Sequence, residues 1–388
     1  MSRPASQHTV RRHNCALVLD AIAAAPGSSR ATVAARTGLT KATVSSLVDR
    51  MIGARLVVEG EAQSRPGPGR RGTALHLSPA GPHGLGVEIG VDHLATCLVD
   101  LTGRVRTSWL RPGDNRASRP SRVLTRVAAA IRLALKEDVA IGGVGVAVPG
   151  LVESATGILR LAPNLGWREV DVRGELTRRL GLDVPVLVGN EANLAALDEL
   201  RHGCGAPDFV HVSGEIGIGA GIVLNGELFE GVSGFSGEIG HLSVDPRGPR
   251  CPCGSRGCLE RLAGQDEIVR AAGVEDLPTL LTALKANDRT ATAAVHDAAK
   301  WLGVALSGAV NLLDLPTVVL GGAYARLEPW LREPLLAELG RRVVSAAWSP
   351  VHVLASTLAS DAATRGAAGT AIRAILADPD PYVTAVLA

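Results

Sequence analysis

The chain has 388 residues, enough for two or three domains, and 46% of them are hydrophobic, which is ample for a sizeable core. No run of about 18 uncharged apolar residues occurs and the first residues lack the apolar segment of a secretory signal, so we expect a cytoplasmic protein without a membrane span. Residues 1–80 hold 11 Lys and Arg against 4 Asp and Glu, net +7, whereas the remainder holds 29 against 34, net −5. This asymmetry predicts a polyanion-binding head on a neutral-to-acidic body.

The basic head is predicted to begin with helices. Apolar side chains at helical spacing indicate the first helix over residues 14–25, which a Pro-Gly pair ends. Ser29 is placed to cap a second helix over residues 30–36, and Thr40 to cap a third over residues 41–52. The head is therefore predicted to contain a compact three-helix unit.

The second and third of these helices have the spacing of a helix-turn-helix motif. A small residue, Ala34, lets the two helices cross closely, and Gly38 permits the turn. Val44 and Leu47 are expected to face inward, so that the N-terminal half of the last helix enters the major groove. The side chains that we expect to contact bases or phosphates are Arg30, Thr32, Lys41, Thr43, Ser46 and Arg50.

Two short strands, over residues 56–59 and 74–77, predict a wing after the helices. The loop between them is rich in Pro, Gly and Arg, which keeps it slim and suits a narrow minor groove. Its arginines, expected to contact DNA, are Arg65, Arg70 and Arg71. The alternative is a three-helix protein-interaction module with a solvated loop, but the helix spacing, the wing and the charge together favour DNA.

A linker rich in Pro and Gly, residues 78–84, joins the head to the body. Strands are predicted in the body at 85–91, 94–100, 141–148, 184–188, 209–213, 220–224 and 317–320. Helices are predicted at 120–136, 192–201, 264–272, 277–286 and 290–313. Because strands, glycine turns and helices occur in this scheme twice, we expect two α/β lobes with a cleft between them.

Three of the six cysteines lie in one Gly-rich loop, with His241 ten positions before the first. Cys251, Cys253 and Cys258 with this His form a Cys3His ligand set for zinc. Four protein ligands leave no open position, so the metal would be structural rather than catalytic. The alternative is three free or disulfide-bonded cysteines, and the tight spacing with a His at hand favours zinc.

Several segments of the body resemble the ROK family, named for repressors, open reading frames and kinases. The matching segments are GVEIGVDHLATCLVDLTG, VAVPGLV, APNLGW, GNEANLAAL, GEIGIGAGIVLNGELFEG, GFSGEIGH, CPCGSRGCLE and VVLGGAY. They span residues 85 to about 325, and the E-x-G-H segment together with the cysteine loop is the most specific part.

That resemblance implies an α/β fold, in which an N-terminal winged helix-turn-helix precedes a two-lobed, actin-like ROK domain of the sugar-kinase and ribonuclease-H-like kind. The expected domains are the DNA-binding head at 1–80, lobe 1 at 81–200 and lobe 2 with the zinc loop at 201–362. A C-terminal helix, about residues 363–388, is expected to complete lobe 1.

Kinases of this family place ATP phosphates on two glycine turns, which read D-x-G-G-T and G-T-G-x-G-x-G. Here residues 88–92 read EIGVD and residues 215–221 read EIGIGAG, so the Thr hydroxyls are lost and Asp92 and Glu215 are added. Phosphate loops depend on backbone N–H donors and positive potential, which these carboxylates oppose. Glu191 stands where the kinases have a catalytic Asp, and its extra methylene would misplace a base by about 1 Å. We therefore expect no enzyme and no catalytic residues.

The residues expected to bind a sugar match the family better than the two glycine turns do. By resemblance, the sugar-binding residues would be Gly150, Asn164, Asn190, Glu191, Glu238, His241 and Glu260. Carboxylates and amides suit vicinal hydroxyls, because each hydroxyl both donates and accepts. His241 would bind zinc through one ring nitrogen and the sugar through the other. The alternative for Asn164 is a turn residue, and for Glu238 and Glu260 it is support of the zinc loop.

These features predict a sugar-responsive, DNA-binding transcriptional regulator that acts as a repressor. Its expected partners are palindromic double-stranded operator DNA, a small sugar effector and further copies of itself, as a homodimer or a dimer of dimers. One alternative is a ROK sugar kinase, which phosphorylates a hexose with ATP, carrying an accessory DNA-binding head. Another is a regulator that senses a partner protein.

Overall fold

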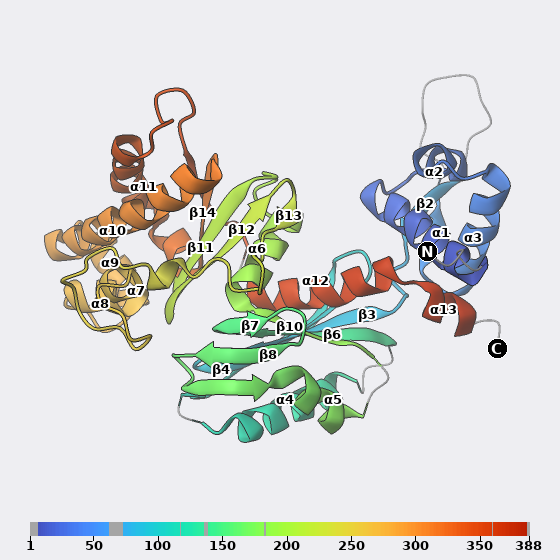
Figure 1. Cartoon of the computed structure of the whole chain (residues 1–388), viewed down its shortest axis with the longest axis horizontal. Helices are drawn as coiled ribbons and strands as arrows, with labels where there is room; N and C mark the ends of the chain where they lie inside the picture. The colour runs from blue at the N-terminus through green and yellow to red at the C-terminus, as the bar shows by residue number, and fades with distance from the viewer. Residues whose placement is uncertain are drawn as a thin grey trace, which may run out of the picture.

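A computed structural model describes residues 7–61, 73–116, 118–135, 139–181, 184–358 and 360–385. These residues form a small head and a body of two lobes, and the end of the chain returns to the head (Figure 1). Among the helices of the described residues, none combines the length and the apolarity that crossing a membrane requires.

Within residues 7–61 and 73–77, the head consists of three helices and an antiparallel pair of strands. They are α1 (Gln7–Ala24), α2 (Arg30–Thr37), α3 (Lys41–Gly53), β1 (Val57–Gly60) and β2 (Ala74–Leu77). Ser29 and Thr40 cap α2 and α3 as predicted, and Gly38 ends α2 in the left-handed conformation, φ 71°. Val44 and Leu47 are buried in the core of the head. The predicted helix-turn-helix is therefore confirmed.

Lobe 1 is built on a sheet with the strand order β10-β6-β3-β4-β5. Its strands are β3 (His83–Ile89), β4 (His93–Val99), β5 (Val105–Pro112), β6 (Ile141–Val148) and β10 (Val186–Asn190). The helices around it are α4 (Pro120–Ala134), α5 (Val172–Leu180), α6 (Glu191–His202) and α12 (Ala362–Ala377). The predicted linker is too long, because β3 already begins at His83, whose backbone N–H donates to Ala140.

Helix α12 lies directly on the sheet of lobe 1 because two strands present glycine to it. A Cβ on Gly86 of β3 would lie 1.9 Å from the Thr364 carbonyl oxygen, and a Cβ on Gly145 of β6 would lie 1.9 Å from that of Ala367. Any larger residue would push the helix away. The opposite face of the sheet, with Leu85 of β3, packs against α4 and α5.

A second, smaller sheet beside lobe 1 was not predicted. It has the order β7-β8-β9, from β7 (Leu151–Glu153), β8 (Ile158–Ala162) and β9 (Trp167–Asp171). These strands are short and alternate weakly, with only Val152, Leu159, Ala162 and Trp167 buried. Local pattern alone is too weak to identify such strands.

Lobe 2 carries the sheet order β13-β12-β11-β14-β15. Its strands are β11 (Phe209–Glu215), β12 (Gly217–Leu224), β13 (Glu227–Leu228), β14 (Thr317–Gly321) and β15 (His352–Ala355). Its helical elements are η1 (Ile239–His241), α7 (Glu260–Ala263), α8 (Gln265–Ala271), α9 (Leu277–Lys285), α10 (Arg289–Leu313) and α11 (Gly322–Arg342). Helix α6 packs against both β12 and α12, so it lies where the two lobes meet.

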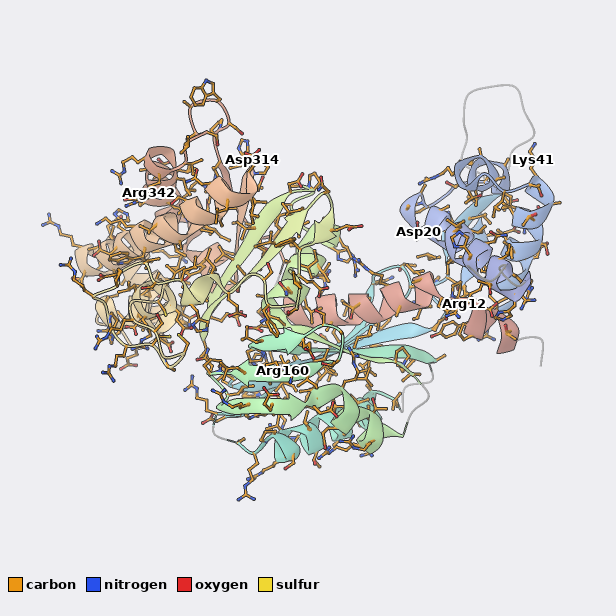
Figure 2. All side chains as sticks on the ribbon, viewed as in Figure 1. Arg12, Asp20, Lys41, Arg160, Asp314 and Arg342 are labelled. Carbon is orange, nitrogen blue, oxygen red and sulfur yellow. The ribbon has the colours of Figure 1, made fainter. Side chains whose placement is uncertain are left out.

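The C-terminal helices connect the cleft side of lobe 1 to the head (Figure 1). Ile372 and Ile375 of α12 share one apolar core with the head, as does Val383 of α13 (Asp380–Ala385). Arg12 of α1 donates to both carboxylate oxygens of Asp378, at 2.7 and 2.5 Å, and lies on the side of the head near α13 (Figure 2). These contacts explain why α1 begins before its predicted start. The domain boundaries given above stay a prediction.

Candidate ligand cleft, metal centre and nucleic-acid interface

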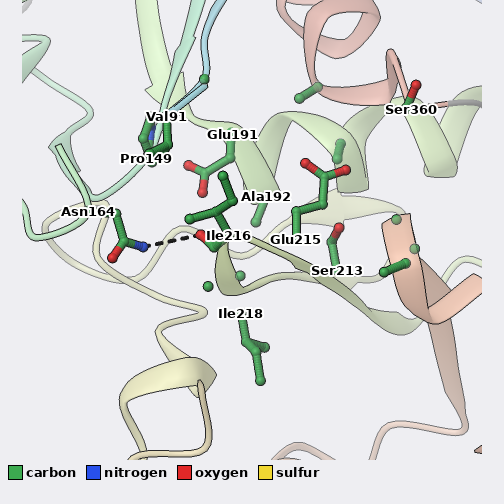
Figure 3. Close-up of a pocket in the computed structure, with 18 of the residues that line it drawn as sticks. Val91, Pro149, Asn164, Glu191, Ala192, Ser213, Glu215, Ile216, Ile218 and Ser360 are labelled. Carbon is green, nitrogen blue, oxygen red and sulfur yellow. Dashed lines mark hydrogen bonds between the residues drawn. The ribbon is translucent and has the colours of Figure 1, made fainter. Parts of the chain in front are cut away.

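A cavity of about 790 Å³ lies between the two lobes, and Figure 3 shows part of its lining. Residues of lobe 1, of lobe 2 and of the start of α12 line it. The structure brings together in this cavity every residue that the sequence suggested for a sugar: Gly150, Asn164, Asn190, Glu191, Glu238, His241 and Glu260. A volume of this size lies within the range of small-molecule sites.

Glu191, the first residue of α6, presents a carboxylate atom that has no partner. Its Oε2 is shielded from solvent and makes no hydrogen bond within the described part of the chain. Burial raises the pKa of Glu191 well above its ordinary value, and the charges of Glu238, Glu88 and Glu215 raise it further. Figure 3 shows Glu191 and Glu215 in the pocket, from α6 and from the end of β11. A ligand hydroxyl would satisfy this unpaired oxygen.

The Glu215 side chain is exposed to the cavity. The protein around it still removes much of its water, and this raises its pKa to about 7. The negative charge of Glu88 is the next largest cause of the rise. The pKa of Glu238 is also raised, chiefly by burial. Near neutral pH the cleft therefore holds carboxyl groups in both protonation states. Such a set both donates to and accepts from ligand hydroxyls.

His93 closes the first glycine turn, and sequence reasoning missed it. Its Nε2 lies 3.5 Å from Glu88 Oε1, and its Nδ1 lies 2.8 Å from Asp92 Oδ1. The hydrogen bond to Glu88 raises the pKa of His93 to about 9, so the imidazole is protonated at neutral pH. A Cβ on Gly90 would lie 2.2 Å from the ring, so the imidazole covers this turn. One imidazolium thus lies between two carboxylates, Glu88 and Asp92, and offsets only part of the negative charge at this turn.

His211 of β11 is a second cleft residue that the sequence did not reveal. It is buried, lines the cavity, and its Nδ1 has no hydrogen-bond partner among the described residues. Burial lowers the pKa of His211 to about 4, so the ring is neutral at physiological pH. It lies in the middle of a strand with apolar neighbours, where a sequence pattern gives no functional signal.

Two asparagines of the cleft are engaged within the protein. Asn190 Oδ1 accepts from the backbone N–H groups of Ala192 and Asn193, at 2.8 and 3.1 Å, and its Nδ2 donates to the Gly150 carbonyl at 3.1 Å. Asn164 Nδ2 donates to the Ile216 carbonyl at 3.2 Å (Figure 3). These bonds favour a positioning role: Asn190 caps α6 and so orients the neighbouring carboxylate.

The predicted metal ligands come together in space. The ligand atoms of His241, Cys251, Cys253 and Cys258 all lie within 4.8 Å of one another, and the cysteines are free thiols. Cys253 Sγ lies 3.6 Å from Cys258 Sγ, and Cys251 Sγ lies 3.7 Å from His241 Nδ1. Ligands arranged tetrahedrally around zinc would be separated by about 3.6–3.8 Å. The residues present therefore fit a structural zinc ion.

The metal loop and the cleft share side chains. His241 Nδ1 faces Cys251, while its Nε2 lies 3.9 Å from Glu238 Oε2 in the cleft. Glu260 Oε1 accepts from the Cys251 thiol at 3.0 Å and lies 3.5 Å from His241 Nδ1. Burial raises the pKa values of the Cys251 and Cys258 thiols. A cation held by this loop would therefore displace their protons and fix the directions of two cleft residues.

The outer surface of the head carries part of the predicted DNA contacts. Lys41 and Ser46 of α3 are exposed, and Thr43 is half-buried. Figure 2 shows Lys41 on the side of the head away from the body. The three predicted wing arginines, Arg65, Arg70 and Arg71, lie outside the described residues.

Of the remaining predicted contacts, Arg30 and Thr32 have partners within the head. Arg30 donates to Asp49 at 2.5 Å and lies 3.1 Å from Glu59, so it holds α2 to α3 and β1. The Thr32 hydroxyl bonds Ser29 at 3.0 Å as part of the helix cap. Arg50 has a buried Nε without a hydrogen-bond partner in the described chain. Arg30, Thr32 and Arg50 are half-buried, as Thr43 is, and their contact with DNA stays a prediction.

Comparison with known proteins matches both parts of the chain. A family model described as ROK family matches residues 84–374, and one described as MarR family matches residues 11–71. The xylose repressor of Bacillus subtilis (strain 168) is 29% identical over 93% of this chain and 95% of its own length.

Solved structures match either nearly the whole chain or about three quarters of it. A ROK family transcriptional regulator, described as a homolog of the E. coli MLC protein, superimposes with a TM-score of 0.80 at 24% identity, covering 97% of this chain and 98% of its own. A ROK family glucokinase from Streptomyces griseus, in complex with glucose and AMPPNP, gives 0.68 at 27% identity, covering 75% of this chain and 99% of its own. The repressor and the regulator thus match both head and body, whereas the kinase matches the body.

Proposed function

The chain belongs to the ROK family, and from this we propose that it is a DNA-binding transcriptional repressor whose operator affinity changes when a sugar occupies the cleft. Its similarity along nearly its whole length to a xylose repressor supports this function. The observation that carries it is structural: one helix, α12, lines the cleft at one end and enters the core of the helix-turn-helix head at the other.

The chemistry of the cleft favours a neutral sugar. Carboxylates dominate its charged lining: Glu88, Asp92, Glu191, Glu215, Glu238 and Glu260. Arg326 and His93 provide the opposing charge, and His93 is already paired. A phosphorylated ligand would meet like charge in a partly desolvated space, whereas neutral hydroxyls would find acceptors and donors. Zinc, held by His241 and the three cysteines, would supply rigidity to this side of the cleft.

Helix α12 links the cleft to the head, and one hydrogen bond ties its start to the cleft. The Thr364 hydroxyl donates to Glu88 Oε2 at 2.6 Å, which ties the start of α12 to the cleft. About two and three turns later, Ile372 and Ile375 pack among the helices of the head. A sugar that changed the spacing of the lobes would thereby move the head. The coupling requires different sugar affinities in the states that do and do not bind the operator.

Replacing Thr364 by Val is expected to weaken this coupling. The change keeps the shape of the side chain and removes only its bond to Glu88. The sugar-induced change in operator affinity, about 5- to 150-fold in typical allosteric proteins, should shrink toward 1 while sugar affinity is retained. Thr370→Val is the matched control, because the Thr370 hydroxyl donates only to Ala367 of the same helix, at 2.7 Å. An equal loss of the sugar response in both variants would contradict coupling through the Thr364–Glu88 bond.

Charge rather than size is expected to exclude phosphorylated sugars. For a sugar that binds, we expect its 6-sulfate ester to bind at least about tenfold more weakly than its neutral 6-O-methyl ether. The difference should grow between pH 6 and pH 8, since Glu215, with a pKa of about 7, loses its proton there. Calorimetric titration of both derivatives measures this. A pH-independent difference would assign the exclusion to size.

The direct test of the proposed function is operator binding by fluorescence anisotropy, with DNA from upstream of the gene and a panel of sugars at fixed salt, since phosphate contacts make affinity salt-dependent. A sugar that shifts the affinity supports the proposal and reveals its sign. Tight operator binding that no sugar changes would contradict the proposed sugar response. Sugar-dependent consumption of ATP would instead support the kinase, which the body's similarity to a glucokinase keeps as the rival.

A further inference from the structure

A second cavity, of about 640 Å³, lies where the head meets the body. Helix α1 of the head forms one wall, and the turn after β4, the end of α6 and the second half of α12 form the others. Among the described residues, none lines both this cavity and the sugar cleft. We call it the junction cavity.

Two arginines line the junction cavity without a partner. Neither Arg201 of α6 nor Arg373 of α12 makes a hydrogen bond or ion pair within residues 7–61, 73–116, 118–135, 139–181, 184–358 and 360–385. Burial and the charge of Arg373 lower the pKa of Arg201 to about 10. Arg201 is half-buried and Arg373 is exposed, so two like charges line one cavity, and an anion would reduce the repulsion between them.

The acidic groups nearby are committed elsewhere or lie at the rim. Asp198 also lines the cavity, but its carboxylate lies 2.8 Å from His202 Nδ1 and 3.4 Å from Arg365 Nε. Asp20 of α1 is exposed and lies on the side of the head that faces the body (Figure 2). The charge of Asp198 acts on Arg201 less strongly than burial and Arg373 do, so the positive charge of the two arginines is only partly offset from within the cavity.

Part of the remaining lining is apolar, beside polar groups that include His13, Thr102 and Arg365. Its apolar side chains come from the head, the lobe and α12: Leu17, Leu77, Leu101, Ile372 and Leu376. Arg201 lies over Gly369 of α12, where a Cβ would fall 2.2 Å from Arg201 Nη1. The glycine thus leaves a slot for the guanidinium. A cavity lined by both cationic and apolar side chains has the character of a site for an amphipathic small molecule.

We propose that the junction cavity binds a small organic anion. Its acidic group is held by Arg201 and Arg373, and its apolar body packs against the leucine side chains of the lining. Guanidinium groups bind phosphate, carboxylate and sulfonate oxygens through parallel hydrogen bonds. Because α1 forms one wall, an occupied cavity would fix the head relative to the body and change operator affinity. This last consequence rests on the proposed function, but the binding itself does not.

The probe for this site is 8-anilinonaphthalene-1-sulfonate, an anion with an apolar body whose fluorescence rises in apolar surroundings. We expect one saturable site per chain, from which inorganic phosphate displaces the dye at constant ionic strength. The double variant Arg201→Gln, Arg373→Gln should bind the dye at least about tenfold more weakly for each guanidinium lost. A saturating neutral sugar should leave dye binding in place, because it occupies the other cavity.

The matched control is Arg122→Gln, Arg168→Gln, which removes the same charge from exposed positions of α4 and β9 in lobe 1. Unchanged dye binding in the junction variant, or an equal loss in the control, would overturn the site; equal melting temperatures exclude misfolding as the cause. If the dye binds as expected but leaves operator affinity unchanged in a chain that still responds to sugar, the site stands and its regulatory role fails.

Discussion

Cys258→Ser is expected to abolish stable zinc binding and, with it, the shape of the sugar cleft. Cys258 is fully buried, and its Sγ lies 3.6 Å from that of Cys253. A hydroxyl is a poor substitute for a thiolate. Losing a residue that only supports a metal ligand lowers metal affinity about 10- to 100-fold. Losing a ligand itself should lower zinc affinity by more than this. The variant should also melt at a lower temperature, because zinc binding contributes directly to folding.

Metal content by mass spectrometry, together with thermal melting, checks this prediction. Wild type should carry about one zinc per chain and lose it as the pH falls, because protons compete for the thiolates and the imidazole. Cys204→Ser, which changes a half-buried free thiol outside the ligand set, should keep its zinc. Full zinc occupancy in Cys258→Ser, or none in wild type, would remove the structural metal from the proposal. Sugar affinity should fall together with zinc, since His241 belongs to both sites.

Glu191→Gln is expected to stabilise the protein without ligand while weakening its sugar binding. The pKa of Glu191 is raised in the folded chain. Such a carboxyl contributes stability below its unfolded pKa, about 4.3, and loses that contribution as the pH rises through its folded pKa. At pH 8 the buried charge therefore costs stability, which Gln avoids at nearly the same shape. The melting temperature should rise at pH 8, and the difference should vanish near pH 4.

Sugar binding should move in the opposite direction. Losing a hydrogen bond to a charged group costs about 1.5–3 kcal/mol, so affinity should fall about 10- to 150-fold. Titration calorimetry measures this fall, and Glu275→Gln, at an exposed position of lobe 2, is the control that should change neither quantity. A variant that melts lower at pH 8, or one that binds sugar as tightly as wild type, would contradict a ligand-binding role for this carboxylate. Opposite effects on stability and binding are typical of residues kept for function.

Local pattern was sufficient where a segment's neighbours in sequence are also its neighbours in space. Strand β6 was predicted with its observed bounds, and Ser29 and Thr40 cap the helices that follow them. The zinc ligands were found because three of them lie within eight residues and Gly257, at φ 59°, turns the loop. The segments that carry the resemblance to the ROK family are likewise continuous stretches. Such features depend on spacing, and spacing is visible in a sequence.

Only the tertiary structure decided which charges meet. Arg30 is paired with Asp49 and Glu59, and nothing in the spacing of these residues predicts the pairing. The same holds for contacts across the whole chain: Thr364 bonds Glu88, and Arg12 bonds Asp378. A sequence fixes which groups are available, through periodicity, caps and ligand spacing. Folding brings distant groups together, and their charge state and exposure depend on the partners that they meet there.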